Sequence, residues 1–186
     1  MKNFFSFSVL SISIILSVSS VSADMAVFVN VNVIPMSTET VLFQQTVIVA
    51  DGEITEIGHV DTISIPKNAL IIDGTKRFLM PGLAEMHAHV TNTHPSEVDR
   101  LSLLVAAGLT PYEALRTGTV EVANFLGSNG GIIAEGKDAD LVLLDSNPLD
   151  KIKNSNRVHG VMLRGKWLPS SELNIKLERD VIQDDK

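Results

Sequence analysis

The sequence has no cysteine among its 186 residues, few aromatic residues, and no surplus of basic over acidic residues. The absence of cysteine excludes disulfide cross-links, thiolate zinc sites and a cysteine nucleophile. The formal net charge of −7 argues against a nucleic-acid partner, because binding to a phosphate backbone needs an excess of Lys and Arg. The chain is also too short for a complete (β/α)8 barrel, which takes roughly 250 residues. With 45% hydrophobic and 20% charged residues, it has the composition of a globular domain.

The N-terminal region has the layout of a cleavable secretory signal peptide. Lys2 precedes an apolar stretch from Phe4 to Val18, and small residues follow up to Ala23, after which a signal peptidase would cut. Serines interrupt the apolar stretch, which is shorter than the roughly 20 residues of a spanning helix, so a membrane anchor is the less favoured alternative. We expect residues 1–23 to be removed, the protein to be periplasmic or secreted, and no membrane contact to remain.

Short β-branched segments separated by turns dominate the residues before 82 and after 130. Val27–Ile34 and Val41–Ala50 are predicted strands, and Asp51-Gly52 predicts a hairpin into a third strand. Further strands are expected at Ala69–Asp73, Leu141–Leu144, Arg157–Leu163 and Lys166–Leu168, the last two joined by a hairpin at Arg164-Gly165. Phe78–Met80 leads into a turn at Pro81-Gly82.

The middle of the chain has helical patterns instead. Leu101–Leu109 has helical spacing, and Gly108 is expected to end that helix. Thr110 is predicted to be the N-cap of the next helix, with proline at its first position and Glu113 completing a capping box. We expect this second helix to continue without a break to Gly127.

The segment that carries chemistry is Pro81-Gly82-Leu83-Ala84-Glu85-Met86-His87-Ala88-His89. If residues 83–90 form a strand, Glu85, His87 and His89 point to the same side. Two imidazoles on one face, two residues apart, can chelate a divalent metal such as Zn, Fe, Ni or Co. An HxH pair alone is a weak signal, because two surface histidines on a loop give the same pattern.

This segment follows the predicted strands and precedes a later Gly136-Lys137-Asp138-Ala139-Asp140-Leu141-Val142. In that order the segments resemble the metal-dependent amidohydrolase superfamily, close to its imidazolonepropionase-like and prolidase-like branch. The resemblance implies an α/β fold with a small composite β-sandwich domain from both chain ends, residues 24–80 and 131–169. Residues 81–130 would be a fragment of the (β/α)8 barrel, and residues 170–186 a charged tail.

The resemblance also implies roles for individual residues. His87 and His89 match the first two metal ligands of the family. The metal would be a divalent ion, and zinc is the ion we expect. Glu85 matches the acidic position beside them, where it would either orient an imidazole or make a polar contact at the bottom of the barrel. Members of the family use metal-activated water to hydrolyse C–N bonds in small amide substrates.

The sequence departs from the family over most of the barrel. The family site also uses a carboxylated lysine, two further histidines and an aspartate from later strands, and none has a matching position here. Only 11 residues, 90–100, separate His89 from the predicted helices, and only 45 residues run from Leu83 to Gly127. Six or seven barrel strands are therefore absent, and the chain is predicted to be internally truncated.

Four other residues are alternative candidates for metal ligands. His94 precedes a proline that favours a loop, from which it could act as a third ligand. Asp99 is expected to be a carboxylate in the first turn of a helix. His59 and His159 lie in the β-rich parts and are predicted to be surface residues.

Two classes of function remain open. The first is a metal-dependent hydrolase by descent whose catalytic site is incomplete in this chain. The second is a non-catalytic truncated remnant or a periplasmic metal-binding β-module. Self-association is expected, because a strand at residues 83–90 that lacks its barrel neighbour leaves an apolar edge unpaired.

Overall fold

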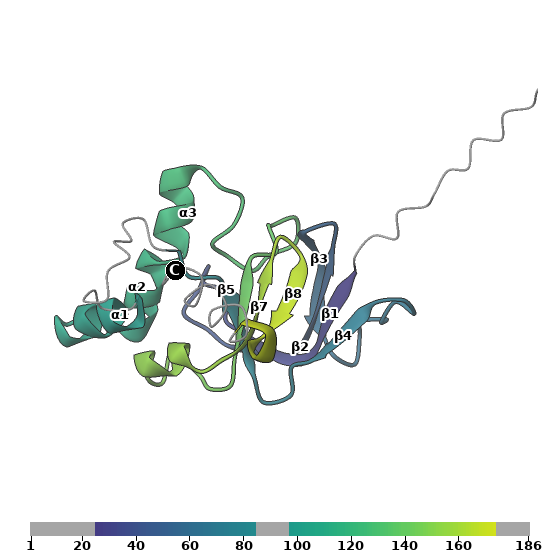
Figure 1. Cartoon of the computed structure of the whole chain (residues 1–186), viewed down its shortest axis with the longest axis horizontal. Coiled ribbons are helices and arrows are strands. Elements are labelled where there is room, and N and C mark those ends of the chain that lie inside the picture. The colour runs from purple at the N-terminus through teal and green to yellow at the C-terminus, as the bar shows by residue number, and fades with distance from the viewer. Residues whose placement is uncertain (1–24, 85–96, 174–186) are drawn as a thin grey trace, which may run out of the picture.

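The computed structural model describes residues 25–84 and 97–173, and these form one curled sheet with short helices to one side of it (Figure 1). The strands are β1 (Ala26–Val33), β2 (Leu42–Ala50), β3 (Glu53–His59), β4 (Leu70–Asp73), β5 (Phe78–Pro81), β6 (Leu141–Leu144), β7 (Val158–Leu163) and β8 (Lys166–Pro169). The helices are α1 (Glu97–Ala106), α2 (Pro111–Thr117), α3 (Val120–Leu126) and the short 3-10 helix η1 (Ile152–Asn156). No helix within these two ranges is long and apolar enough to cross a bilayer. The predicted signal peptide lies outside the described residues.

All eight strands are hydrogen-bonded into one sheet, in the order β3-β2-β1-β5-β6-β7-β8, with β4 paired to β1. Strand β1 runs antiparallel to β2 on one side. On its other side it is parallel to β4 along its first half and to β5 at its end. Strand β5 is antiparallel to β6, so strands before residue 82 and after residue 140 share the sheet.

Both predicted hairpin turns are present, and they bring the ends of the sheet together. Asp51 and Gly52 have φ of 52° and 85°, and Arg164 and Gly165 have φ of 50° and 78°. Two consecutive positive φ angles are typical of a type I′ turn, whose twist matches that of the strands. A Cβ on Gly165 would lie 2.8 Å from the Cα of Gly52, so the two turns are in close contact. The expected β-sandwich is therefore one continuous sheet that curls on itself.

The two faces of the curled sheet bury separate apolar clusters. The inner core gathers side chains from both halves of the chain, including Phe28, Leu79 and Leu141, and Trp167 packs against it. The Phe28 and Trp167 rings meet edge to face, with centroids 5.5 Å apart. The outer core is formed where α1, α2 and η1 cover the other face of β5 and β6, and its buried residues are Ile34, Met36, Met80, Leu101, Ala114, Leu115, Val142, Leu144 and Ile152.

The N-terminus of α2 is capped as predicted. The Glu113 backbone N–H donates to Thr110 Oγ1 at 3.2 Å, and the Thr110 backbone N–H donates to Glu113 Oε2 at 2.8 Å. The hydrogen bonds from the Thr110 backbone and side chain lower the pKa of Glu113 below its usual value. The capping box thus satisfies helix donors that have no partner within the helix.

The prediction of one unbroken second helix is wrong, because the structure has two helices, α2 and α3, in its place. The chain leaves helical geometry at Gly118 and Thr119, where Thr119 has φ −125° and ψ −85°. Gly131 packs so closely there that a Cβ on it would lie 2.9 Å from the Thr119 carbonyl oxygen. The predicted end of α3 at Gly127 is correct, with φ of 64°.

Candidate functional site

The backbone that leads into the predicted metal-binding segment is anchored at two points. The Gly82 N–H donates to the Asp140 carbonyl at 2.8 Å, which continues the pairing of β5 with β6. The Ala84 N–H donates to the Gly118 carbonyl at 2.9 Å, at the break between α2 and α3. Gly82 and Ala84 are therefore held between the sheet and the helices.

The predicted ligands themselves lie beyond this anchor. Glu85, His87, His89 and the alternative ligand His94 are outside the described residues. The predicted strand at residues 83–90 is described only at Leu83 and Ala84, which are not in a strand. Asp99 lies in the first turn of α1, as expected.

The two remaining histidines have the surface positions that the sequence predicted. His59 ends β3, with its side chain 44% exposed and its Nδ1 3.3 Å from Asp61. His159 lies in β7, with its side chain 36% exposed and its Nδ1 3.2 Å from Asp145 Oδ1. Within residues 25–84 and 97–173 no group of three or more His, Cys, Asp or Glu side chains is placed to hold a metal ion.

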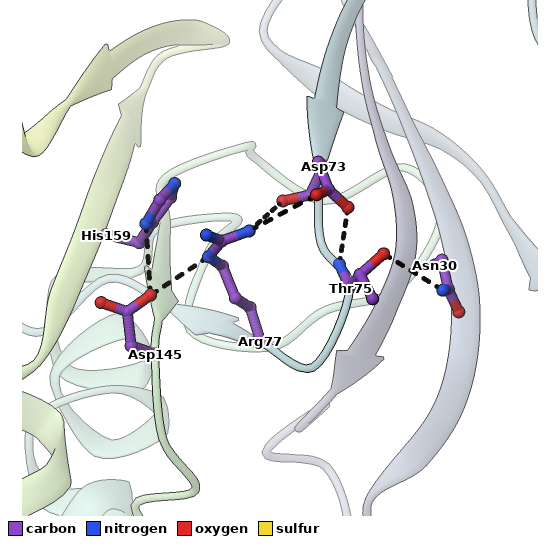
Figure 2. A network of polar contacts seen from close by, with 6 residues as sticks. All are labelled: Asn30, Asp73, Thr75, Arg77, Asp145 and His159. Atoms are coloured by element: carbon purple, nitrogen blue, oxygen red, sulfur yellow. Dashed lines mark hydrogen bonds and ion pairs between the residues drawn. The ribbon is translucent and has the colours of Figure 1, made fainter.

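Sequence reasoning did not identify a polar network that links the two halves of the sheet (Figure 2). Arg77, just before β5, places Nε 3.1 Å from Asp145 Oδ1 at the end of β6. Its Nη1 donates to the Asp73 carbonyl at 2.9 Å. Asp145 also contacts His159, so one carboxylate joins the β4–β5 turn to β6 and β7.

The network continues along the β4–β5 turn towards β1. The Thr75 N–H donates to Asp73 Oδ1 at 2.9 Å, and Asn30 Nδ2 donates to Thr75 Oγ1 at 3.2 Å. Hydrogen bonds from the Thr75 side chain and backbone lower the pKa of Asp73. Every charged group of this network faces a partner, and the Thr75 hydroxyl is engaged with the Asn30 amide and the Asp73 carboxylate. The arrangement therefore supports the strands rather than chemistry.

Comparisons with known proteins agree with the family suggested by the sequence. The family model described as the amidohydrolase family matches residues 92–168, from before α1 to β8. An adenine deaminase from Staphylothermus marinus is 32% identical over a 110-residue alignment that covers 54% of this chain and 16% of that protein. The chain thus spans less than a fifth of the length of this curated relative.

Solved structures extend the similarity to most of the fold. A protein from Bifidobacterium longum, provisionally named a prolidase, superposes with a TM-score of 0.66 at 13% identity, over 78% of this chain and 95% of its own. A beta-aspartyl dipeptidase from Fervidobacterium islandicum gives a TM-score of 0.56 at 10% identity, over 79% and 96% of the two chains. At these identities the superpositions establish the fold, a mixed α/β structure, and the family model and the curated relative add the sequence similarity. Together these findings show that residues 92–168 resemble the amidohydrolase family in sequence and that most of the described fold resembles that of solved amidohydrolase structures.

Proposed function

We propose that this chain binds a divalent metal ion through His87 and His89 and descends from hydrolases that act on amide-type C–N bonds. The observation that carries the proposal is the anchored backbone from Gly82 to Ala84, directly before the two histidines. Two backbone hydrogen bonds hold the chain up to Ala84, three residues before His87 in the sequence. The names of the similar proteins, a deaminase and a dipeptidase, support C–N hydrolysis as the ancestral chemistry.

We infer further that the catalytic site is incomplete. A catalytic zinc ion is held by three protein ligands and keeps a fourth position for water or substrate. His87 and His89 supply two imidazoles, and the carboxylated lysine, the two further histidines and the aspartate of the family have no matching positions in this sequence. When bound, the metal would supply Lewis-acid polarisation, with Glu85 available to orient an imidazole. Two ligands bind an ion without fixing the geometry that hydrolysis requires, so we derive no catalytic step.

The same proposal covers the organisation of the chain. We propose that the sheet, residues 24–80 and 131–169, is the composite domain of the family and that residues 81–130, with α1 to α3, are what remains of its barrel. The substrate-selecting loops of a complete barrel lie at the ends of strands that this chain does not have. Small amide substrates therefore belong to complete relatives, and this chain acts as a metal-binding module.

Export and self-association are proposed on sequence grounds. The layout of residues 1–23 supports secretion to the periplasm with cleavage after Ala23. Apolar side chains on short elements support self-association, since Phe125 and Leu126 of α3 are 74% and 64% exposed.

Zinc titration of the purified full chain tests the metal proposal. We expect binding of zinc, which His87→Ala and His89→Ala each weaken by about tenfold or more. His59→Ala is the matched control, because His59 is an exposed histidine paired only with Asp61 and should leave binding unchanged. Zinc binding that survives both substitutions would overturn the assignment of the ligands.

A hydrolysis screen on dipeptides, lactams and adenine, with zinc present, tests the inferred incompleteness. We expect no turnover above the background of the metal alone. Turnover that is lost in His87→Ala would contradict the incomplete site while leaving the metal assignment in place.

A further inference from the structure

The loop between α3 and β6 depends on the side-chain amide of Asn129. Its Nδ2 donates to the Gly136 carbonyl at 2.7 Å, and its Oδ1 accepts from Lys137 Nζ at 3.0 Å. The Asp138 N–H donates to the Asn129 carbonyl at 3.3 Å. One exposed asparagine therefore holds the two ends of this loop together.

The same loop closes the curled sheet. The Gly136 N–H donates to the Ile54 carbonyl, the Ile54 N–H donates to the Lys137 carbonyl, and the Ala139 N–H donates to the Gly52 carbonyl, each at 2.8 Å. These bonds attach the segment before β6 to the start of β3. A change that breaks the hydrogen bonds of the Asn129 side chain should therefore also weaken the pairing of residues 136–139 with β3.

Asn129 is the only asparagine in the sequence that is followed by glycine. We propose that Asn129 is a spontaneous modification site, at which deamidation through a cyclic imide converts the amide that holds the loop into a carboxylate. Asn129 is exposed, and a Cβ placed on Gly130 would have no atom nearer than 4.0 Å. Gly130 has no side chain that would hinder the approach of its backbone nitrogen to the Asn129 side chain. No atom packed near the position of its missing Cβ hinders that approach either.

The reaction needs only water. Gly130 N loses its proton to solvent base and bonds to Asn129 Cγ. Nδ2 then takes up a proton from water and leaves as ammonia when the Cγ–Nδ2 bond breaks. Water then adds to one of the two imide carbonyls and opens the ring, which leaves either aspartate or isoaspartate at position 129. No atom is oxidised or reduced.

Lys137 favours the addition step. Its ammonium group lies 3.0 Å from Asn129 Oδ1, the oxygen on which negative charge develops as Gly130 N bonds to Cγ. A cationic donor aimed at a developing oxyanion stabilises it. The hydrogen bond from Nδ2 to Gly136 acts in the opposite direction, because the amide must turn away from it to react. Deamidation should therefore proceed in the folded protein, but more slowly than in the unfolded chain.

The product cannot make the original contacts. A carboxylate has no N–H to donate to the Gly136 carbonyl, and two oxygens would face each other where the bond had been. Isoaspartate also lengthens the backbone by one methylene. Each outcome removes the hydrogen bond from position 129 to the Gly136 carbonyl, so we expect it to weaken the attachment of this loop to the sheet edge.

Peptide mapping by mass spectrometry, after incubation of the folded protein in mildly alkaline buffer, tests the site. We expect the peptide with Asn129 to gain the mass of an amide-to-acid change, while Asn68, an exposed asparagine followed by alanine, stays unchanged. Gly130→Ala should slow the conversion several-fold, and its new Cβ would meet only Asp138 Cβ and Ser128 Oγ, each at 4.0 Å, so we expect the fold to be preserved. Conversion in urea but none in the folded protein would overturn the proposal, as would an equal rate in Gly130→Ala.

A mimic of the product tests the structural consequence. Asn129→Asp should lower the Tm by about 2–4 °C, the effect of one lost hydrogen bond in a chain of this size. Asn68→Asp is the matched control, since it adds the same charge on the exposed surface away from this loop. Equal Tm values for the two variants would contradict the role of Asn129 in holding the loop.

Discussion

The inner and outer cores lie on opposite faces of the same strands, yet they are built in different ways. The inner core draws on residues from Ala26 to Met162, so it forms only when both halves of the chain pair. The outer core needs the helices, of which α1 to α3 come from one continuous stretch between β5 and β6 and η1 lies between β6 and β7. Two of these helices have only seven residues, and a helix that short is not stable alone in water. The helices therefore depend on the sheet more than the sheet depends on the helices.

Two natural probes separate these regions. The chain has one tryptophan and one tyrosine. Trp167 packs on Phe28 in the inner core, whereas Tyr112 lies in α2, where its hydroxyl donates to the Met36 carbonyl at 3.2 Å. Their fluorescence and near-ultraviolet absorbance report the two cores independently in the unmodified protein.

Phe28→Ala should have the largest effect. Phe28 is fully buried, so its truncation removes apolar contacts and the edge-to-face contact with Trp167, at a cost of about 3–5 kcal/mol. Because the helices rest on the sheet, we expect the Trp167 and Tyr112 signals to be lost in one transition. Urea unfolding followed by both probes measures this. Phe43→Ala, at a position 63% exposed, should change the stability by less than about 0.5 kcal/mol.

Leu115→Ala should act on the outer core alone. Leu115 is a fully buried residue of α2, and its truncation should lower the free energy of unfolding by about 2–3 kcal/mol. The Tyr112 signal should then be lost at a lower urea concentration than the Trp167 signal. Leu103→Ala, on the exposed side of α1 at 63% exposure, is the control and should leave both midpoints in place. Coincident transitions in Leu115→Ala would show that the two cores form one cooperative unit.

The smallest effect is expected from pH, again in the helical region. The pKa of Glu113 is lowered in the folded state, so its contribution to stability is complete above about 4.5 and is lost as the pH falls further. The Tyr112 transition should therefore shift to lower urea concentration in acid. Far-ultraviolet circular dichroism against pH measures the loss of helix.

Two variants test the cause of that pH dependence. Glu113→Gln should remove the part of the acid sensitivity that comes from the capping box. Thr110→Ala, which removes the side-chain hydrogen bond to Glu113, should lower the free energy of unfolding by about 1 kcal/mol at neutral pH. Thr110→Ser keeps the hydroxyl and should therefore retain most of the stability that the cap provides. An unchanged acid profile in Glu113→Gln would contradict the assignment.

The sequence predicted those features whose cause is local. The hairpins at Asp51-Gly52 and Arg164-Gly165 follow from turn residues that tolerate positive φ, and the cap at Thr110 follows from hydroxyl and carboxylate spacing. Strand positions were predicted within a few residues for the same reason. The order of the strands and the curling of the sheet were beyond this local reasoning, because they depend on which segments pair.

Features created by tertiary contacts were missed or predicted incorrectly. The break between α2 and α3 occurs where the Gly118 carbonyl meets the Ala84 N–H, a contact between segments far apart in the sequence. The bridge from Arg77 to Asp145 exists only because β5 and β6 are neighbours. The metal ligands His87 and His89 rest on a motif and a family resemblance, and they stay a prediction.

The pairing of β5 with β6 has an evolutionary consequence. Its register, from Phe78 opposite Leu144 to Pro81 opposite Leu141, involves no residue of the interval between the two strands. The hydrogen bonds of the sheet therefore do not fix how much polypeptide lies between Ala84 and the start of α1. Insertions or deletions in that interval can therefore change the inserted segment while the sheet keeps its strand pairing.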